Sequence, residues 1–416
     1  IGETGIKMRS RKIMFTVSIS TLIVLILMKI GFFKLESSFG YPFNVLIIIF
    51  LLSGDILLFQ HNIDNNHEAG IINYDNVDIL KYVCSILILV LHLRPFVAYS
   101  NSLDFFFNNI ITRLCAPTFF LITGYFVAKN ERKDPGYIKK FIKKTIPMYL
   151  VWSILYLPAI IGTAINNVPL VNSYLEKLNI PQEFIVPLVV FLAPIALLLA
   201  LFYTGFYYHL WYFPAVIISL LILAKWKSKF KLKYLLIISF VLLLFGATET
   251  YYGVLPFSVQ EVLSYYYQVF FTTRNFLFFG LFYVVLGYHL GTKKDPYSKY
   301  SFLKLIVWIF LLIFEATILQ DAARLNSNIL LSCIPLVYYL FTSVIYLTNI
   351  IKTKFPFRDL SKYYYLVHPM IIFIVNNFFS GIKKNPFYYL LGVVMVTHLV
   401  SWLIIKLKQK YRKLVI

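Results

Sequence analysis

The sequence predicts an all-α, polytopic membrane protein: a transmembrane helical bundle of about 12 spans. Composition is the first observation, because 60% of the 416 residues are hydrophobic and only 14% are charged, which excludes a soluble globular protein. The second is that apolar runs of about 20 residues, each long enough to cross the hydrocarbon core as a helix, recur along the whole chain. These runs also lack the alternation of polar and apolar residues that a transmembrane β-barrel requires. Helices are therefore expected throughout.

The order of the apolar runs gives the expected spans. The first two are expected to form a hairpin, so residues 1–76 would be an N-terminal two-span unit with a polar linker. Residues 77–416 would form a membrane domain of about ten spans. The linker contains histidines and acidic residues, but no second cluster with ligand spacing, so no metal site is expected. The predicted spans lie at residues 13–31, 44–59, 77–95, 107–127, 146–164, 208–224, 234–247, 270–291, 303–320, 329–349, 363–379 and 387–405.

The positive charges predict the orientation of the bundle. Lysines and arginines gather in short clusters between the apolar runs, as the positive-inside rule expects of cytoplasmic loops. With about 12 crossings and both termini in the cytoplasm, every cluster faces the cytoplasm. The net charge of +21 therefore indicates membrane topology, and no nucleic-acid partner is expected. The first apolar run lacks a small-residue cleavage site, so it is expected to remain as a span. The clusters lie at residues 7–12, 129–144, 225–233, 293–304, 352–362 and 406–413.

One further apolar stretch, residues 183–203, does not fit this count. A single crossing there would move every later basic cluster to the outer side. Pro187 and Pro194 would also break a straight spanning helix. A re-entrant or interfacial segment on the outer side is therefore expected, with paired short crossings as the alternative.

Several ionisable residues lie inside predicted spans, where each costs at least about 2.5 kcal/mol and is by default a functional-site candidate. His92 lies near the far end of the span at 77–95, and Arg113 lies in the first turns of the span at 107–127. The orientation places both in the outer half of the membrane. Residues from other spans share this depth, namely His209, Arg274, Asn275 and Glu315. Their common depth predicts one polar chamber.

Some of these residues also have a structural interpretation. His209 lies in the aromatic segment YYHLWYF, which is typical of a membrane interface. Arg274 and Glu315 could form an ion pair that only neutralises two buried charges.

On the cytoplasmic side, Asp78 and Lys81 are three residues apart and can pair on one helical face. The basic loop at 129–144, which includes Lys139 and Lys140, is expected to attract anionic lipid headgroups or the phosphates of a soluble donor such as coenzyme A. The residues alone do not separate these two partners.

Five blocks of the chain follow one another in a recognisable order. Together they resemble the acyltransferase-3 family of bacterial integral membrane acyltransferases, over residues 77 to about 405. The YHLWYFPA block, and TRN followed by FEA, most resemble the membrane half of vancomycin-resistance membrane-bound serine racemases. The five blocks read VDILKYVCSILILVLHL, RLCAPTFFLITGYF, HLWYFPA, TTRNFLFFGLFYVVLGY and LSKYYYLVHP.

This resemblance implies an O-acyltransferase of the bacterial plasma membrane. It implies transfer of an acetyl or other short acyl group from acyl-CoA, as co-substrate, to a hydroxyl of a cell-envelope glycan or lipid-linked sugar. No bound cofactor is expected, and membrane lipids are the surroundings. His92 matches the family's essential histidine, and Arg113 its arginine. Lys81 stands where the family usually has arginine, and lysine cannot grip a phosphate with two parallel bonds. The racemases continue into a soluble pyridoxal-phosphate domain, which is not expected here, so racemase activity is not predicted.

The expected mechanism is acylation of a hydroxyl with His92 as general base, because a neutral imidazole titrates in the required range. Arg113, helped by Arg274, would stabilise the oxyanion or hold a phosphate. Tyr207, His209 and Trp211 would line the acceptor entrance. The alternative is a membrane transporter of a small polar solute such as L-serine, which would use the same chamber for binding without chemistry.

Overall fold

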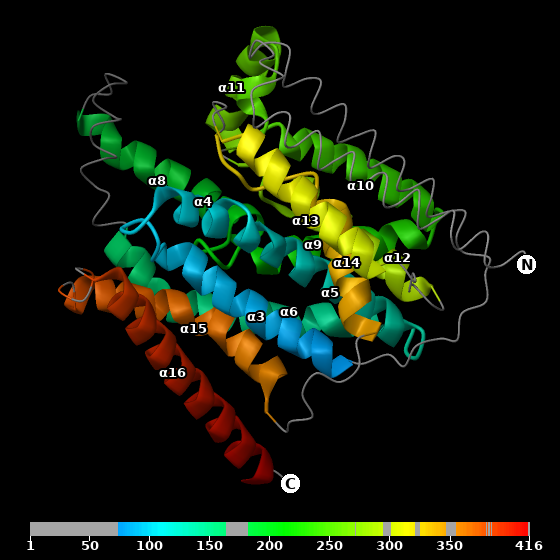
Figure 1. The fold of residues 1–416 in the computed structure, drawn as a ribbon. Helices are drawn as coiled ribbons and strands as arrows, with labels where there is room; N and C mark the ends of the chain where they lie inside the picture. The colour runs from blue at the N-terminus through cyan, green and yellow to red at the C-terminus, as the bar shows by residue number, and fades with distance from the viewer. Residues whose placement is uncertain are drawn as a thin grey trace, which may run out of the picture.

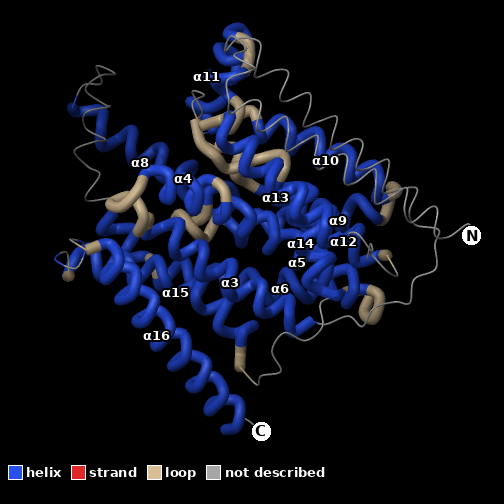
Figure 2. Tube along the Cα trace, in the orientation of Figure 1, coloured by secondary structure: helices blue, strands red, loops and turns tan. Residues whose placement is uncertain are grey.

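The computed structural model describes residues 74–163, 182–270, 272–293, 301–320, 325–346, 355–379, 381, 383 and 385–414. Within these ranges the regular structure is helical and includes no strand, which confirms the predicted all-α class (Figures 1 and 2). The predicted N-terminal hairpin lies outside the described residues except for its last three positions, so it stays a prediction.

The helices follow the predicted apolar runs closely along the chain. The first half contains α3 (Tyr74–Leu93), α4 (Asn101–Asn109), η1 (Ile111–Leu114), α5 (Cys115–Glu131), α6 (Tyr137–Leu155), α8 (Gln182–Leu199), η2 (Ala200–Thr204), α9 (Tyr212–Lys227) and α10 (Leu232–Ala247). The second half contains η3 (Tyr252–Val254), α11 (Phe257–Phe270), η4 (Phe276–Gly280), α12 (Leu281–Thr292), α13 (Ser301–Ile318), α14 (Cys333–Tyr346), α15 (Phe357–Phe378) and α16 (Pro386–Leu414).

Length and hydropathy identify the helices that can cross a membrane. Among the described residues there are three, at Tyr74–Leu93, Asn101–Glu131 and Pro386–Lys410. A fourth span results if Tyr137–Leu155 and Leu157–Thr163, bent by 50°, count as one. Other apolar helices are shorter than a full crossing. The bundle is therefore helical and apolar, while the count of about 12 and the orientation of the termini stay predictions.

The segment at 183–203 differs from its prediction in one respect. Helix α8 includes both Pro187 and Pro194 and continues into the π-helical turn η2. A proline removes one backbone hydrogen bond, and the neighbouring turns here retain helical geometry on both sides. The α-helix therefore runs through both prolines, whereas the apolar helix delimited by length and hydropathy begins at Pro194, one of the two prolines at which a break was predicted. Whether the segment is re-entrant or spanning stays a prediction.

Helices α5 and α12 lie against each other at the centre of the bundle. A Cβ atom added to Gly287 would lie 2.0 Å from the carbonyl oxygen of Leu121, and one added to Gly124 would lie 2.1 Å from that of Val284. Only glycine permits this approach, as is common where helices pack inside membranes. This contact holds α5, whose first turn follows Arg113, in place.

Replacing Gly287 with leucine should prevent stable folding. The nearest neighbour is backbone, which cannot rotate away, and overpacking of even flexible cores costs about 1–3 kcal/mol. The measurement is the yield and thermal unfolding of monodisperse protein in detergent. Gly392→Leu on α16 is the control, because nothing lies within 4 Å of a Cβ at that position. Equal stability of the two variants would contradict the close contact.

Helix α15 packs against both α3 and α16, so these three elements lie side by side although α3 is far away in sequence (Figure 1). This arrangement brings residues of the predicted span at 363–379 next to the end of α3. It therefore decides which groups surround His92.

Candidate functional site

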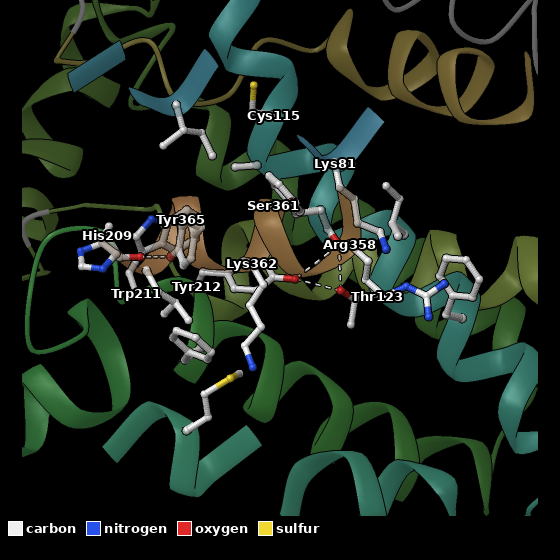
Figure 3. Close-up of a pocket in the computed structure, with 18 of the residues that line it drawn as sticks. Lys81, Cys115, Thr123, His209, Trp211, Tyr212, Arg358, Ser361, Lys362 and Tyr365 are labelled. Atoms are coloured by element: carbon white, nitrogen blue, oxygen red, sulfur yellow. Dashed lines mark hydrogen bonds between the residues drawn. The ribbon is translucent and has the colours of Figure 1, made fainter. Parts of the chain in front are cut away.

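One cavity of about 960 Å³ is lined by α3, η1, α5, α6, α9, η4, α15 and α16, together with the loops before α6, α9, η4 and α14. Figure 3 shows that its polar groups separate into two ends. His209, Trp211 and Tyr365 lie at one end, and Lys81 and Arg358 lie at the other. Tyr212 and Thr123 lie between them, with their hydroxyl oxygens 2.8 Å apart. We call the two ends the histidine–arginine end and the basic end.

Two imidazoles from different elements, His92 and His209, line the histidine–arginine end, and a third, His368, packs against both without lining the cavity. The rings of His92 and His368 are stacked with their centroids 5.4 Å apart, and those of His209 and His368 are 6.0 Å apart. Nδ1 of His368 lies 2.7 Å from the carbonyl oxygen of Tyr364, so this nitrogen donates its proton. The described residues contain no group of His, Cys, Asp or Glu that could hold a metal ion.

Sequence analysis did not place His368 in this site. By sequence, His368 lies early in the predicted span at 363–379, just after the basic cluster at 352–362, and this places it nearer the cytoplasmic half than His92. Its presence in the LSKYYYLVHP block was the available signal. The packing of α15 on α3 places it beside His92.

The end of α3 fixes the position of His92. The helix stops at Leu93 because Arg94 adopts a left-handed conformation, with φ of 45°, while its N–H still donates to Val90 at 2.9 Å. This conformation is costly for a residue with a side chain and needs support. The ion pair between Arg94 and Asp104 of α4 supplies it. His92 therefore stays on the last turn of a capped helix, at the cavity wall.

Two arginines complete this end. Nη1 of Arg113, in η1, donates to the side-chain oxygen of Asn328 at 3.1 Å. The guanidinium of Arg274 lies over the ring of Trp211, 5.1 Å from its centroid. The Nε atom of Arg274 is buried and has no hydrogen-bond partner among the described residues.

His209 and Trp211 are presented by a tight turn at Gly205. The φ of Gly205 is 76°, and a Cβ there would lie 2.4 Å from the backbone nitrogen of Trp211. Both facts require glycine. The His209 carbonyl accepts a hydrogen bond from Tyr365, and the ring is buried. Neither ring nitrogen has a hydrogen-bond partner in the described part of the chain.

The structure brings together about half of the residues predicted for the site. The lining of the cavity includes six of them: Lys81, His92, Arg113, His209, Trp211 and Arg274. Tyr207 is not part of the lining, because its ring stacks on that of Tyr156 with the centroids 4.9 Å apart.

Asn275 and Glu315 support the backbone and do not line the cavity. The side-chain oxygen of Asn275 caps η4 by accepting from Leu277 and Phe278 at 2.8 and 3.0 Å. Glu315 has its own set of partners.

The carboxylate of Glu315 accepts hydrogen bonds from the backbone N–H groups of Leu331 and Ser332, at 2.6 and 2.8 Å, and from the hydroxyl of Tyr251. These donors stabilise its buried charge. The suggested Glu315–Arg274 ion pair is therefore not the arrangement found.

The basic end carries a strong excess of positive charge. Its lining, within the described residues, includes a single carboxylate, Asp359. Asp78 is next to this end but does not line it. One of its carboxylate oxygens pairs with Lys81 at 2.7 Å, as predicted, and the other pairs with Arg358 at 2.9 Å. The cations of the lining are Lys81, Lys129, Lys133, Lys144, Arg358, Lys362 and Lys408.

Lys139 and Lys140, predicted to bind the donor, face away from this end. On α6 the cavity is lined by Tyr137, Phe141, Lys144 and Met148, which share one helical face. The two lysines lie on the exposed face. Lys140 there pairs with Asp134 at 2.7 Å, which holds the pKa of that carboxyl below its ordinary value. The basic cluster was found from sequence, but the face of the helix that carries the site was not.

Comparison with known proteins identifies the family. A family model described as an acyltransferase domain matches residues 74–406, which is most of the chain. The chain belongs to the acyltransferase-3 family. This result confirms the resemblance seen in the five sequence blocks, and it shows that the chain carries an acyltransferase domain.

Curated relatives of this chain are named as racemases. It is 27% identical over 301 residues to an amino-acid racemase of Enterococcus faecalis, covering 70% of this chain and 39% of that protein. It is 25% identical to a second amino-acid racemase of the same organism, covering 81% of this chain and 47% of that protein. A serine/alanine racemase of Enterococcus gallinarum is 24% identical, with 80% and 46% covered. The chain therefore spans less than half the length of these relatives. No solved structure matches the chain.

Proposed function

We propose that this acyltransferase moves an acetyl or other short acyl group from acyl-CoA to a hydroxyl of a cell-envelope glycan or lipid-linked sugar. The observation that carries the proposal is the single cavity joining a basic end to a buried histidine–arginine end. The basic end suits a phosphorylated donor, and the other end suits acyl transfer. The positive-inside rule places the basic end at the cytoplasmic face of a bacterial plasma membrane.

The donor would bind with its phosphates at the basic end. Lys133, Lys144 and Lys362 project into the cavity there and would form charge-assisted hydrogen bonds with phosphate oxygens. The thioester arm would lie along the apolar and aromatic middle, which includes Phe119, Ile122 and Tyr212. Its acyl end would then reach His92.

The chemical step is an addition followed by an elimination. His92 accepts the proton of the acceptor hydroxyl as that oxygen attacks the thioester carbonyl. The carbon–sulfur bond then breaks, and the same proton passes from His92 to the sulfur of coenzyme A. The products are an ester and the free thiol.

The arginines would act on the charge that develops in this step. Arg113 is oriented by Asn328, and Arg274 is oriented over Trp211, so both cations are held in place before the reaction. Preorganised donors of this kind stabilise an oxyanion without rearrangement. The ring nitrogens of His209 would bind a hydroxyl of the acceptor.

Donor dependence tests the proposal. Purified protein in vesicles should transfer the labelled acyl group of acetyl-CoA to an added envelope glycan or lipid-linked sugar fraction, and heat-inactivated protein should not. The names of the relatives make L-serine the relevant competing ligand. Accumulation of labelled L-serine in the vesicles without any acyl transfer would support a transporter instead.

A further inference from the structure

Three consecutive residues outside the cavity, Glu249, Thr250 and Tyr251, contact two loops, one that carries Arg274 and one that carries Asn328, the partner of Arg113. They follow α10 and are all buried, with 3%, 1% and 5% of their surfaces exposed. A carboxylate in such a place is costly unless hydrogen bonds satisfy it. We call residues 249–251 the clamp.

The carboxylate of the clamp holds the loop before η4. One oxygen of Glu249 accepts from the backbone N–H of Thr273 at 2.8 Å and lies 2.6 Å from the Thr273 hydroxyl. The hydroxyl of Thr272 lies 3.3 Å from the same oxygen. Thr273 is fully buried, and the next residue is Arg274. Glu249 therefore fixes the backbone from which Arg274 extends over Trp211.

The same clamp holds the loop before α14. The carbonyl oxygen of Glu249 accepts from the N–H of Leu325 at 3.2 Å, and the hydroxyl oxygen of Thr250 accepts from the N–H of Ile329 at 3.1 Å. These two bonds enclose Asn328, which binds Arg113. The loop is thus fixed on both sides of the residue that orients the second arginine.

Tyr251, the last residue of the clamp, also helps to fix the loop before α14. The hydroxyl of Tyr251 donates to Glu315, which accepts the N–H groups of Leu331 and Ser332. One short segment therefore sets the positions of two loops that are distant in sequence.

We propose that Glu249 is a positioning residue of the acyltransferase, and that the clamp sets Arg274 and the Asn328–Arg113 pair relative to each other. The inference rests on the proposed function for its chemical consequence, because the two arginines act together on one oxyanion. Misplacing a catalytic group by about 1 Å can lower a rate by about 10²-fold. The clamp supplies the rigid support that such preorganisation needs.

Hydrogen–deuterium exchange tests the clamp without any assumption about activity. In Glu249→Ala, which removes the carboxylate but keeps the main-chain carbonyl, amides of the loop at 272–275 should exchange faster than in the wild type. In Thr250→Val, which removes the hydroxyl bonded to Ile329, amides of the loop at 325–332 should exchange faster. Amides of α5 and α12 should not change in either variant. Thr273→Val, which keeps the side-chain shape and removes one donor, should give a smaller change in the first loop. Thr273→Val provides the test of the first loop if Glu249→Ala does not fold. Glu261→Ala, at an exposed position of α11, is the matched control and should change neither loop. Unchanged exchange in both loops, or a uniform increase along the chain, overturns the proposal.

Kinetics then test whether the clamp acts through Arg274. In Glu249→Ala, kcat should fall by about 10²-fold, and KM for acetyl-CoA should stay unchanged because the basic end is separate. The effect should largely disappear in the Arg274→Ala background, since residues that act through one another are not additive. Additive effects, or a loss confined to KM, overturn the positioning role. A wild-type protein that transfers no acyl group refutes the proposed function, and the exchange experiment still decides the clamp.

Discussion

Acyl transfer should fall by about 10²–10⁴-fold when His92 is replaced by alanine, with folding and donor binding unchanged. The imidazole is the proposed acceptor of the hydroxyl proton, and no other titratable group occupies its position at the end of α3. His368 stacks on His92, but it does not line the cavity. The measurement is the initial rate of label transfer from acetyl-CoA at saturating donor.

A matched control separates this loss from a general effect of removing a histidine. His289 lies on α12 outside the cavity, so His289→Ala should retain the wild-type rate. Thermal unfolding and the dissociation constant for acetyl-CoA should agree between the two variants. Near-normal transfer by His92→Ala would show that the mechanism is wrong.

The paired substitution Lys144→Ala/Lys362→Ala should raise KM for acetyl-CoA by about 10²-fold and leave kcat nearly unchanged. Both side chains line the basic end, and a charge-assisted hydrogen bond contributes about 1.5–3 kcal/mol. At about 1.4 kcal/mol per tenfold change, two contacts at the lower of these values give this factor. KM of the wild type should also rise with salt, because phosphate–cation attraction at an open cavity mouth is screened.

Lys139→Ala/Lys140→Ala is the control for this experiment. It removes the same amount of charge as the test pair, but from positions on α6 that do not line the cavity. It should leave KM close to that of the wild type. An equal rise in both paired variants would mean that net charge, rather than a defined phosphate site, attracts the donor.

Much of the fold was predictable, because the length of an apolar run is a local property. The run at 77–95 became α3 at Tyr74–Leu93, and the run at 387–405 became the first part of α16. Helix α11, at Phe257–Phe270, was not predicted. Its tyrosines and polar residues interrupt any long apolar run, so hydropathy does not reveal it.

The site was predictable to the extent that depth defines it. His92, Arg113, His209 and Arg274 were grouped because they share one level, and the structure places all four around one cavity. Glu315 shares that level, but its side chain does not line the cavity and instead accepts hydrogen bonds from backbone N–H groups. Depth gives one coordinate, and it does not say which way a side chain points.

The sequence by itself determined the helical class, most helix positions, the separation of charge along the chain and the family. These depend on apolar length, loop charge and the order of short blocks, all of which are local. Only the tertiary structure decided that His368 joins His92, that Lys144 rather than Lys139 lines the cavity, and that the clamp supports both the loop of Arg274 and the loop of Asn328. The reason is physical: the angle of each helix about its axis follows from contacts such as that of α5 with α12. Those contacts join residues more than a hundred positions apart.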